Sequence, residues 1–209
     1  MHLIKEPYQL LSKDGQAWLF PEFITGEKAD AYLKNFMSDI QWKQEPILIF
    51  GKWVMQPRLT ALYGTSDKSF GYSGITMKPH PMTAPILEIK NKLKDVSEID
   101  FNTVLFNQYR NGHDSMGWHR DNETELGVNP VVASISFGDT RKFRLRHYRE
   151  KKLSVDVQLT HGSLLLMTGA TQHHWEHSLP KTAKSEQTRI NLTFRKIVHE
   201  GLNRYLLRK

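Results

Sequence analysis

Two early segments of the chain, residues 25–40 and 83–96, place an apolar residue at every third or fourth position. The recurring residues are Tyr32, Phe36 and Ile40 in the first segment and Ile86, Ile89, Leu93 and Val96 in the second. This spacing puts the apolar side chains on one face of a helix. In the second segment, Thr83 suits the N-cap and Pro85 the first turn. We therefore predict an amphipathic helix in each segment.

After residue 100 the pattern changes to short runs of β-branched and aromatic residues, separated by Gly, Asn, Asp and Pro. The runs are 101–109, 131–138, 142–148, 153–159, 163–169 and 189–197. This pattern predicts strands, and residues 46–57 predict a strand and a turn. Early helices followed by many strands indicate an α+β domain whose second half is a sandwich or barrel. A two-sheet jelly roll fits, but spacing alone does not distinguish it from other sandwiches.

The last predicted strand separates polar from apolar residues. Arg189, Asn191, Thr193 and Arg195 alternate with Ile190, Leu192 and Phe194. Successive strand residues point to opposite faces, so two arginines share the polar face. That face is either exposed to solvent or lines a polar pocket in which a guanidinium binds a carboxylate. The run 101–109 offers the same choice, because Asn107 and Tyr109 share a face and both side chains can hydrogen-bond an anion.

Composition narrows the class of protein. The chain has 209 residues, of which 39% are hydrophobic, which suits one globular domain. It has no cysteine, so disulfides, zinc–thiolate sites and cysteine nucleophiles are excluded, and any metal needs nitrogen and oxygen ligands. No long apolar run opens the chain, so we expect neither a signal peptide nor a membrane span. The motifs begin close to the start of the sequence, so we also expect no partner-binding N-terminal tail. We expect a monomer in a reducing compartment, a bacterial cytoplasm or, in a eukaryote, the nucleus.

The net charge of +7 and the sequence pI of about 9.5 favour a polyanionic partner, with nucleic acid ahead of a membrane. The segment 141–152 shows how such a partner could bind. Its basic and aromatic residues Arg144, Arg146 and Tyr148 alternate with Phe143, Leu145 and His147. One face of a strand would then be basic and could follow a phosphate backbone. A solvated basic hairpin is the alternative.

His119 and Asp121 are two residues apart, so in an extended chain both side chains point the same way. An imidazole and a carboxylate on one face can bind one metal ion or simply pair at the surface. A metal site needs a third ligand. The downstream candidates are His147, His161, His173, His174, His177 and His199. Among them, His177 follows an apolar strand and its turn, at the start of a polar loop, where a ligand at the mouth of a barrel would lie. Two histidines and one carboxylate form the facial triad of non-haem Fe(II) oxygenases, which leaves coordination positions open.

The order of six motifs resembles the AlkB family of Fe(II)- and 2-oxoglutarate-dependent dioxygenases. The motifs are NQY, HRD, ASISFG, HGSLLLM, HHWEHSLP and RINLTFR. The resemblance covers about residues 46–197 and is closest to the animal homologue 2 and 3 type, which shares FGKW, PR, YSG and NLTFRKI. It implies a double-stranded β-helix, or jelly roll, with a catalytic core at about 101–197. N-terminal helices and a nucleotide-recognition lid would occupy about 1–100 of the single domain.

The resemblance implies roles for particular residues. It assigns Fe(II) to His119, Asp121 and His177, which are also the catalytic centre. It assigns 2-oxoglutarate to Asn107, Tyr109, Arg189, Thr193 and Arg195, with Arg189 on the distal carboxylate. The implied activity is hydroxylation of an N-methyl group on DNA, with O2 as the second co-substrate. The hydroxymethyl group would leave as formaldehyde, which repairs 1-methyladenine and 3-methylcytosine.

Those methyl groups lie on the pairing edge, so the enzyme must act on single strands or flip the base out. By resemblance the substrate-binding residues are Phe50, Gly51, Lys52, Arg58, Phe70, Tyr72, Ser73 and Asn122. Phe50 would wedge into a duplex where the base was, unless it is a core residue. We also expect His174 or Trp175 near the base, with core packing as the alternative for Trp175.

One residue departs from the homologue 2 type, which usually has HRDDE where this chain has HRDNE. Asn122 therefore replaces an acid that would face a cationic methylated base, which leaves base preference open. Two other function classes also remain open. One is a 2-oxoglutarate oxygenase that acts on RNA, a protein or a small molecule. The other is a non-catalytic nucleic-acid-binding module.

Overall fold

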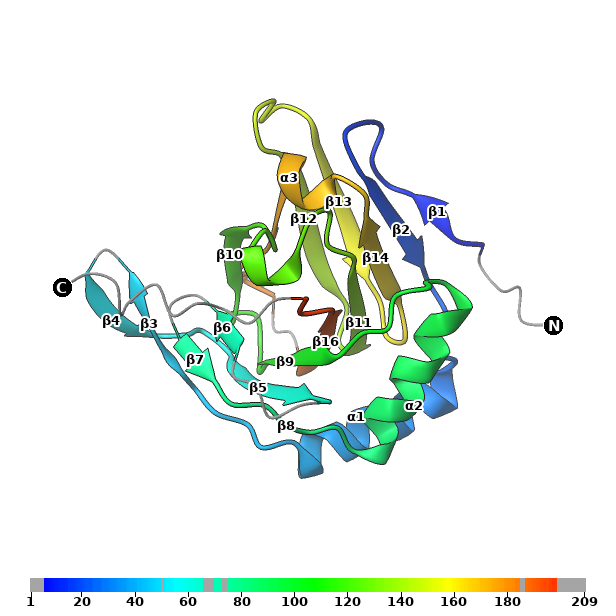
Figure 1. Cartoon of the computed structure of the whole chain (residues 1–209). Helices are drawn as coiled ribbons and strands as arrows, with labels where there is room; N and C mark the ends of the chain where they lie inside the picture. The colour runs from blue at the N-terminus through cyan, green and yellow to red at the C-terminus, as the bar shows by residue number, and fades with distance from the viewer. Residues whose placement is uncertain (1–5, 50, 66–69, 73–74, 185–186, 199–209) are drawn as a thin grey trace.

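The computed structural model describes residues 6–49, 51–65, 70–72, 75–184 and 187–198, in which two β-sheets face each other (Figure 1). The larger sheet has the order β1 (Tyr8–Gln9), β2 (Gln16–Phe20), β14 (Leu164–Thr168), β11 (Val132–Gly138), β16 (Arg189–Arg195), β9 (Thr103–Tyr109), β5 (Leu59–Gly64) and β8 (His80–Pro81). The smaller sheet has the order β10 (Met116–His119), β15 (Trp175–Leu179), β12 (Arg141–His147) and β13 (Ser154–Leu159). The predicted jelly roll is confirmed.

Two helices cover the outer face of the larger sheet (Figure 1). α1 (Gly26–Asp39) and α2 (Ala84–Lys92) follow Thr25 and Thr83 at their N-caps, so both predicted helices are confirmed. The 3-10 turn η1 (Leu93–Asp95) extends α2. The predicted apolar stripes are buried against the outer side chains of the sheet, including Phe106, Phe137 and Phe194. Burial of this apolar area is the main force that holds the helices on the sheet.

A second core fills the space between the two sheets. From the larger sheet it includes Leu19, Val132, Leu165 and Met167, and from the smaller one Phe143, Leu145, Val157, Leu159 and Trp175. The Trp175 ring is fully buried, and its Nε1 donates a hydrogen bond to the Lys13 carbonyl at 3.1 Å. Of the two alternatives for Trp175, core packing is therefore correct and a base contact is wrong.

Two hairpins lie outside the sheets, beyond β5 in Figure 1. One consists of β3 (Pro46–Ile49) and β4 (Lys52–Met55), and the other of β6 (Phe70–Tyr72) and β7 (Ile75–Met77). The first matches the strand and turn predicted at 46–57. Each pairs with no strand of the larger sheet within the described residues, so the hairpins extend from the domain as a separate layer.

Several elements differ from the expectation. His177 was expected in a polar loop, which is wrong, because it lies in the middle of the buried strand β15. The segment 171–174 forms the short helix α3 (Thr171–His174), and η2 (Thr124–Leu126) follows β10. Strands β2 and β5 also join the larger sheet, although both precede residue 100. Within the described ranges, no helix combines the length and apolar character that crossing a membrane requires.

Candidate active site

His119 and His177 lie directly opposite each other on neighbouring antiparallel strands, β10 and β15. Their ring centroids are 4.2 Å apart. Asp121 follows two residues after His119, just beyond the end of β10. One ligand atom from each of His119, Asp121 and His177 lies within 4.8 Å of the others. The structure thus brings together three groups that are 58 residues apart in the chain at their extremes.

The protonation states in this cluster suit a metal. The Nδ1 atom of His119 lies 2.9 Å from the carbonyl oxygen of Gly117 and donates to it, which leaves Nε2 unprotonated in the neutral ring. Burial lowers the pKa of His119, and burial together with the His119 charge lowers that of His177 to about 3. Both rings are therefore neutral at physiological pH, which is the form that binds metals.

Asp121 is ionised for a different reason. Burial is the largest single effect and raises the pKa of this carboxyl, but Arg195, His177 and His119 nearby, together with the hydrogen bond from Arg195, lower it below its usual value. The Arg195 Nη2 donates to both Asp121 oxygens at 2.9 Å. The Asp121 backbone N–H donates to the side-chain oxygen of Gln172, in α3, at 3.0 Å. The carboxylate is thus fixed in charge and in position.

A polar pocket opens beside the three groups, between the two sheets. Its polar lining includes all five residues expected to hold 2-oxoglutarate, namely Asn107, Tyr109, Arg189, Thr193 and Arg195, together with Ser134 and Asn191. Apolar side chains complete the wall: Leu105, Met116, Phe143, Met167 and Leu179. The polar face of β16 lines this pocket, while its apolar face packs against the helices. The solvent-exposed alternative for this strand is wrong, since all seven of its residues are buried.

Arg189 is a buried cation that lines this pocket. It is 2% exposed, its Nη2 donates to the Ser136 hydroxyl at 2.9 Å, and its Nε has no hydrogen-bond partner within the described residues. Burial lowers the pKa of Arg189 to about 10, so the guanidinium stays charged at neutral pH. No carboxylate of the described chain forms an ion pair with it. A buried cation without an acidic partner is costly, so this geometry suits an anionic ligand.

Comparison with known families agrees with this geometry. Residues 16–195 match the model of the 2OG-Fe(II) oxygenase superfamily. The chain belongs to this superfamily. Its name specifies Fe(II) and 2-oxoglutarate, so these are the cofactor and co-substrate implied for the chain. The cluster and pocket fit both: two neutral imidazoles and one carboxylate are a donor set for Fe(II), and a ring nitrogen of His177, Nδ1, is buried without a partner in the described chain.

Two curated relatives place this superfamily member among the AlkB homologues, as the motifs predicted. The human alpha-ketoglutarate-dependent dioxygenase alkB homolog 3 is 41% identical over 191 residues, which are 86% of this chain. The mouse DNA oxidative demethylase ALKBH2 is 40% identical over 206 residues, which are 93% of this chain. The chain spans 65% of the human relative and 86% of the mouse one. A solved structure titled "The structure of OsALKBH1" shares the fold, with a TM-score of 0.61 at 15% identity over 90% of this chain and 99% of that one.

A second cluster of this oxygenase-superfamily chain, Asp14, His147 and His174, also has ligand atoms within 4.8 Å of one another. Its protonation argues against a metal. The Glu150 backbone N–H donates to Nδ1 of His147 at 3.0 Å, so the proton of the neutral ring lies on Nε2. That nitrogen is 3.3 Å from an Asp14 oxygen and has no free electron pair for a metal. His174, expected near the base, stacks on the His147 ring, and its contact with a base remains a prediction.

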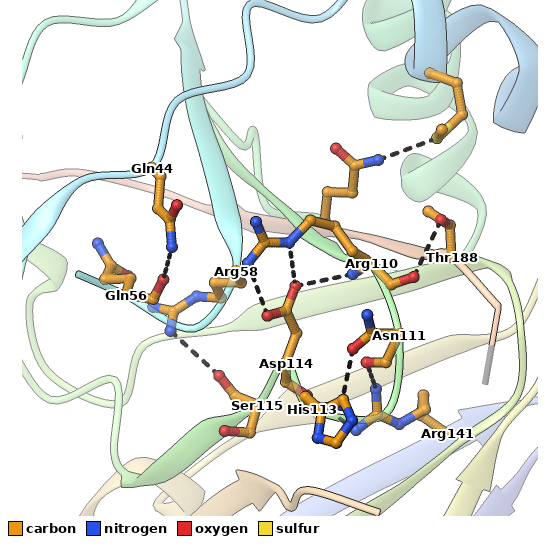
Figure 2. Close-up of polar contacts among 12 residues, drawn as sticks. Gln44, Gln56, Arg58, Arg110, Asn111, His113, Asp114, Ser115, Arg141 and Thr188 are labelled. Atoms are coloured by element: carbon orange, nitrogen blue, oxygen red, sulfur yellow. Dashed lines mark hydrogen bonds and ion pairs between the residues drawn. The ribbon is translucent and has the colours of Figure 1, made fainter. Parts of the chain in front are cut away.

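Arg58 was expected to bind substrate, but its guanidinium is buried behind the pocket. Its Nε donates to the Asn107 side-chain oxygen at 2.8 Å, and its Nη1 lies 3.5 Å from the Ser115 carbonyl oxygen, a contact that Figure 2 shows. Arg58 therefore orients Asn107. A direct contact of Arg58 with the substrate remains a prediction.

Of the other expected substrate residues, Gly51 and Lys52 lie on the β3–β4 hairpin. All four residues of β4 are exposed, including Lys52 and Trp53, and Trp53 is 66% exposed. Gly51 has a φ of +76°, which favours glycine at this turn. Phe50 and Ser73 lie outside the described residues, as do the side chains of Phe70 and Tyr72. Asn122 is exposed beside Asp121.

The basic face predicted on β12 is present on the outer side of the smaller sheet. Phe143, Leu145 and His147 point inward and are buried, as expected. Arg144 pairs with Asp156 at 2.9 Å, and Arg146 pairs with Glu176. Both guanidiniums lie over the Trp118 ring, at 5.6 and 4.1 Å from its centroid. Acidic partners therefore neutralise part of this face, and phosphate binding there remains a prediction.

Sequence reasoning missed several residues of the site. Ser134 lines the pocket and accepts a hydrogen bond at 2.8 Å from Asn191, which the sequence placed on the polar face of β16 without a role of its own. The polar position of Ser134 alternates with apolar ones in β11, a pattern that could have identified it. Glu123 is a second case: burial raises its pKa to about 7, and its Oε2 is buried without a partner in the described chain. Nothing in the sequence distinguishes it from an exposed acid.

Proposed function

We propose that the chain is an Fe(II)- and 2-oxoglutarate-dependent dioxygenase that removes methyl groups from N1 of adenine and N3 of cytosine in DNA. One observation supports this proposal above all: His119, Asp121 and His177 converge beside Arg189, a buried cation without an acidic partner in the described chain. The name of the human relative points to the same co-substrate, and that of the mouse relative, a DNA oxidative demethylase, to the same chemistry on DNA.

In this proposal His119, Asp121 and His177 hold Fe(II). Arg195 keeps the Asp121 carboxylate charged and correctly oriented. Arg189 binds the distal carboxylate of 2-oxoglutarate, which neutralises its buried charge. Asn107 and Tyr109 add hydrogen bonds, while Thr193 and Arg195 lie toward the keto-acid end.

Bound Fe(II), with 2-oxoglutarate and O2, supplies a hydroxylation: one O2 and one 2-oxoglutarate give succinate, carbon dioxide and an N-hydroxymethyl group. That group leaves as formaldehyde, and the C–N bond breaks with its electron pair on the base nitrogen. The chain contributes position and a shielded environment. Leu105, Met116, Phe143 and Met167 form an apolar wall that excludes water from the reaction centre.

The substrate reaches this pocket as an unpaired base. The pairing edge carries the methyl group, so a duplex base must be flipped out. The β3–β4 hairpin has the required chemistry, because Lys52 offers a charge for phosphate and Trp53 an exposed ring that can stack on a base. Phe50, which follows β3 in the sequence and precedes Lys52 and Trp53, is the proposed wedge.

The test is mass spectrometry of oligonucleotides that carry 1-methyladenine or 3-methylcytosine, with and without 2-oxoglutarate. We expect loss of 14 mass units, one CH2 group, only when Fe(II) and 2-oxoglutarate are both present. The variants His177→Ala and Arg189→Gln should lose this activity. Lys90→Gln, on the outer helix α2 where Lys90 pairs with Asp100, is the matched control and should keep it. Activity on methylated RNA alone would contradict the DNA assignment.

A further inference from the structure

Arg141 is an almost fully buried guanidinium at the start of β12. It is 1% exposed. Its two terminal nitrogens donate to three backbone carbonyls, those of Asn111 at 3.1 Å, Asp114 at 3.1 Å and Pro180 at 2.8 Å. Figure 2 shows Arg141 against the turn of residues 111–114. This turn connects β9 with β10, and Pro180 directly follows β15, so one side chain joins segments from both sheets.

Arg141 also lies against Tyr109, a residue of the candidate co-substrate pocket. Its Cζ is 6.0 Å from the centre of the Tyr109 ring, and the Cζ of Arg189 is 5.3 Å from the same ring. Arg189 and Tyr109 both line the pocket, whereas Arg141 is not among its lining residues. The ring thus contacts two cations, one within the pocket and one behind its wall.

The two positive charges act on each other. The charge of Arg141 contributes to the lowered pKa of Arg189, after the larger effect of burial. The two neighbouring cations repel each other, and both attract a carboxylate that enters the pocket. Because both guanidiniums are buried, water screens this attraction only weakly.

We propose that Arg141 is a positioning residue for the dicarboxylate co-substrate. It fixes the ring of Tyr109 and adds a second positive charge behind the site of the distal carboxylate. This inference rests on the proposed assignment of Arg189 and Tyr109 to 2-oxoglutarate. It adds a residue that sets co-substrate affinity without touching the co-substrate.

A purely structural role for Arg141 makes a different prediction. The turn that it binds precedes β10, which contains His119, and Pro180 follows β15, which contains His177. If Arg141 only held these segments together, its loss would move the side chains of His119, Asp121 and His177 apart. Metal binding and co-substrate binding would then weaken to the same extent. Our proposal predicts loss of co-substrate affinity alone.

The experiment is calorimetric titration with Mn(II), a redox-inactive substitute for Fe(II), and then with 2-oxoglutarate. The chains compared are wild type, Arg141→Gln, Arg141→Lys and Arg110→Gln. Arg110 is the matched control, because it pairs with Asp114 in the same turn, as Figure 2 shows, whereas the guanidiniums found against the Tyr109 ring in the described chain are those of Arg141 and Arg189. Its loss loosens the turn without removing the charge behind the pocket.

We expect Arg141→Gln to raise the Kd for 2-oxoglutarate roughly fivefold or more, and that for Mn(II) by less than about twofold. Arg141→Lys keeps the charge but lacks the planar face that packs on Tyr109, so roughly a twofold to threefold rise is expected. Arg110→Gln should leave both constants unchanged.

An unchanged Kd for 2-oxoglutarate in the Arg141 variants would overturn the proposal, as would an equal loss of both affinities or an equal effect of Arg110→Gln. If circular dichroism shows that Arg141→Gln does not fold, the Arg141→Lys titration decides by the same criteria. A wild-type chain that binds no 2-oxoglutarate would instead contradict the proposed function itself, and with it this inference.

Discussion

The Nη2 atom of Arg195 lies 2.9 Å from both carboxylate oxygens of Asp121, and both side chains are buried. The guanidinium comes from β16, an inner strand of the larger sheet, and the carboxylate follows β10, an edge strand of the smaller sheet. The pair therefore connects the two sheets at the reaction centre. It also helps to keep the pKa of Asp121 below its usual value, although burial alone would raise it.

Arg195→Gln should destabilise the protein by roughly 3–5 kcal/mol, because it leaves the Asp121 charge buried without a partner. It should also weaken Mn(II) binding at neutral pH, since part of Asp121 becomes protonated. Denaturant unfolding and calorimetry measure the two effects. Arg144→Gln is the matched control: Arg144 forms an exposed pair with Asp156, so its loss should cost less than about 1 kcal/mol. Equal losses of stability in the two variants would contradict this account.

Phe50→Ala should reduce repair of duplex DNA much more than repair of single strands. A wedge replaces stacking that is lost when a base leaves a duplex, and a single strand does not need it. We expect about a tenfold or larger loss on duplex and less than about a twofold loss on single strands, measured on 3-methylcytosine oligonucleotides. Val128→Ala, at an 87% exposed position after η2, serves as the control. Equal losses on the two substrates would remove the wedge from the mechanism.

Asn122→Asp should increase activity on cationic bases. The side chain is exposed beside Asp121, and an added negative charge there attracts the positive charge of 1-methyladenine. We expect kcat/KM to rise by roughly threefold or more on this base and not on neutral 3-methylthymine. The neutral base also corrects for any effect of the new acid on the metal. A similar change on both bases would show that Asn122 does not contribute to base preference.

Asp114→Asn should destabilise the protein at neutral pH and less so in acid. The Asp114 carboxylate accepts hydrogen bonds from the Arg110 backbone and guanidinium, which lower its pKa although burial opposes them. A lowered folded-state pKa stabilises the fold above the ordinary value of 3.8, and this contribution disappears as the pH falls below it. Because Arg110 is partly exposed, the loss at pH 7 should be only about 1–2 kcal/mol.

Urea unfolding at pH 7 and near pH 3 measures that contribution. The difference between wild type and Asp114→Asn should be largest at pH 7 and shrink toward pH 3. A constant difference at both pH values would mean that the hydrogen-bond geometry, and not the carboxylate charge, supplies the stability. Lys92→Gln, which removes an exposed pair with Asp95, should change little at either pH.

The sequence by itself determined the elements that bury one continuous face. Apolar residues recur with a helical period in residues 25–40 and 83–96 because one side of each helix packs on the sheet. In β16, polar and apolar residues alternate because one face lines the pocket and the other packs in the core. The order of motifs identified the family and the residues now seen around one pocket. All of these patterns depend on local periodicity or on short fixed spacings, which can be read directly from the amino-acid sequence.

Only the tertiary structure decided which polar residues are buried. The polar segment HHWEHSLP predicted a loop from His177 onward, but its residues Trp175–Leu179 form the buried strand β15. Glu176 is buried because Arg146 and Lys151, distant in the chain, cover and pair with it. Arg141, whose guanidinium is bound by three backbone carbonyls, was likewise indistinguishable from a surface charge. Burial of a charge costs free energy, which ion pairs and hydrogen bonds offset. Folding brings the partners in these contacts together from distant parts of the chain, so the sequence does not show them side by side.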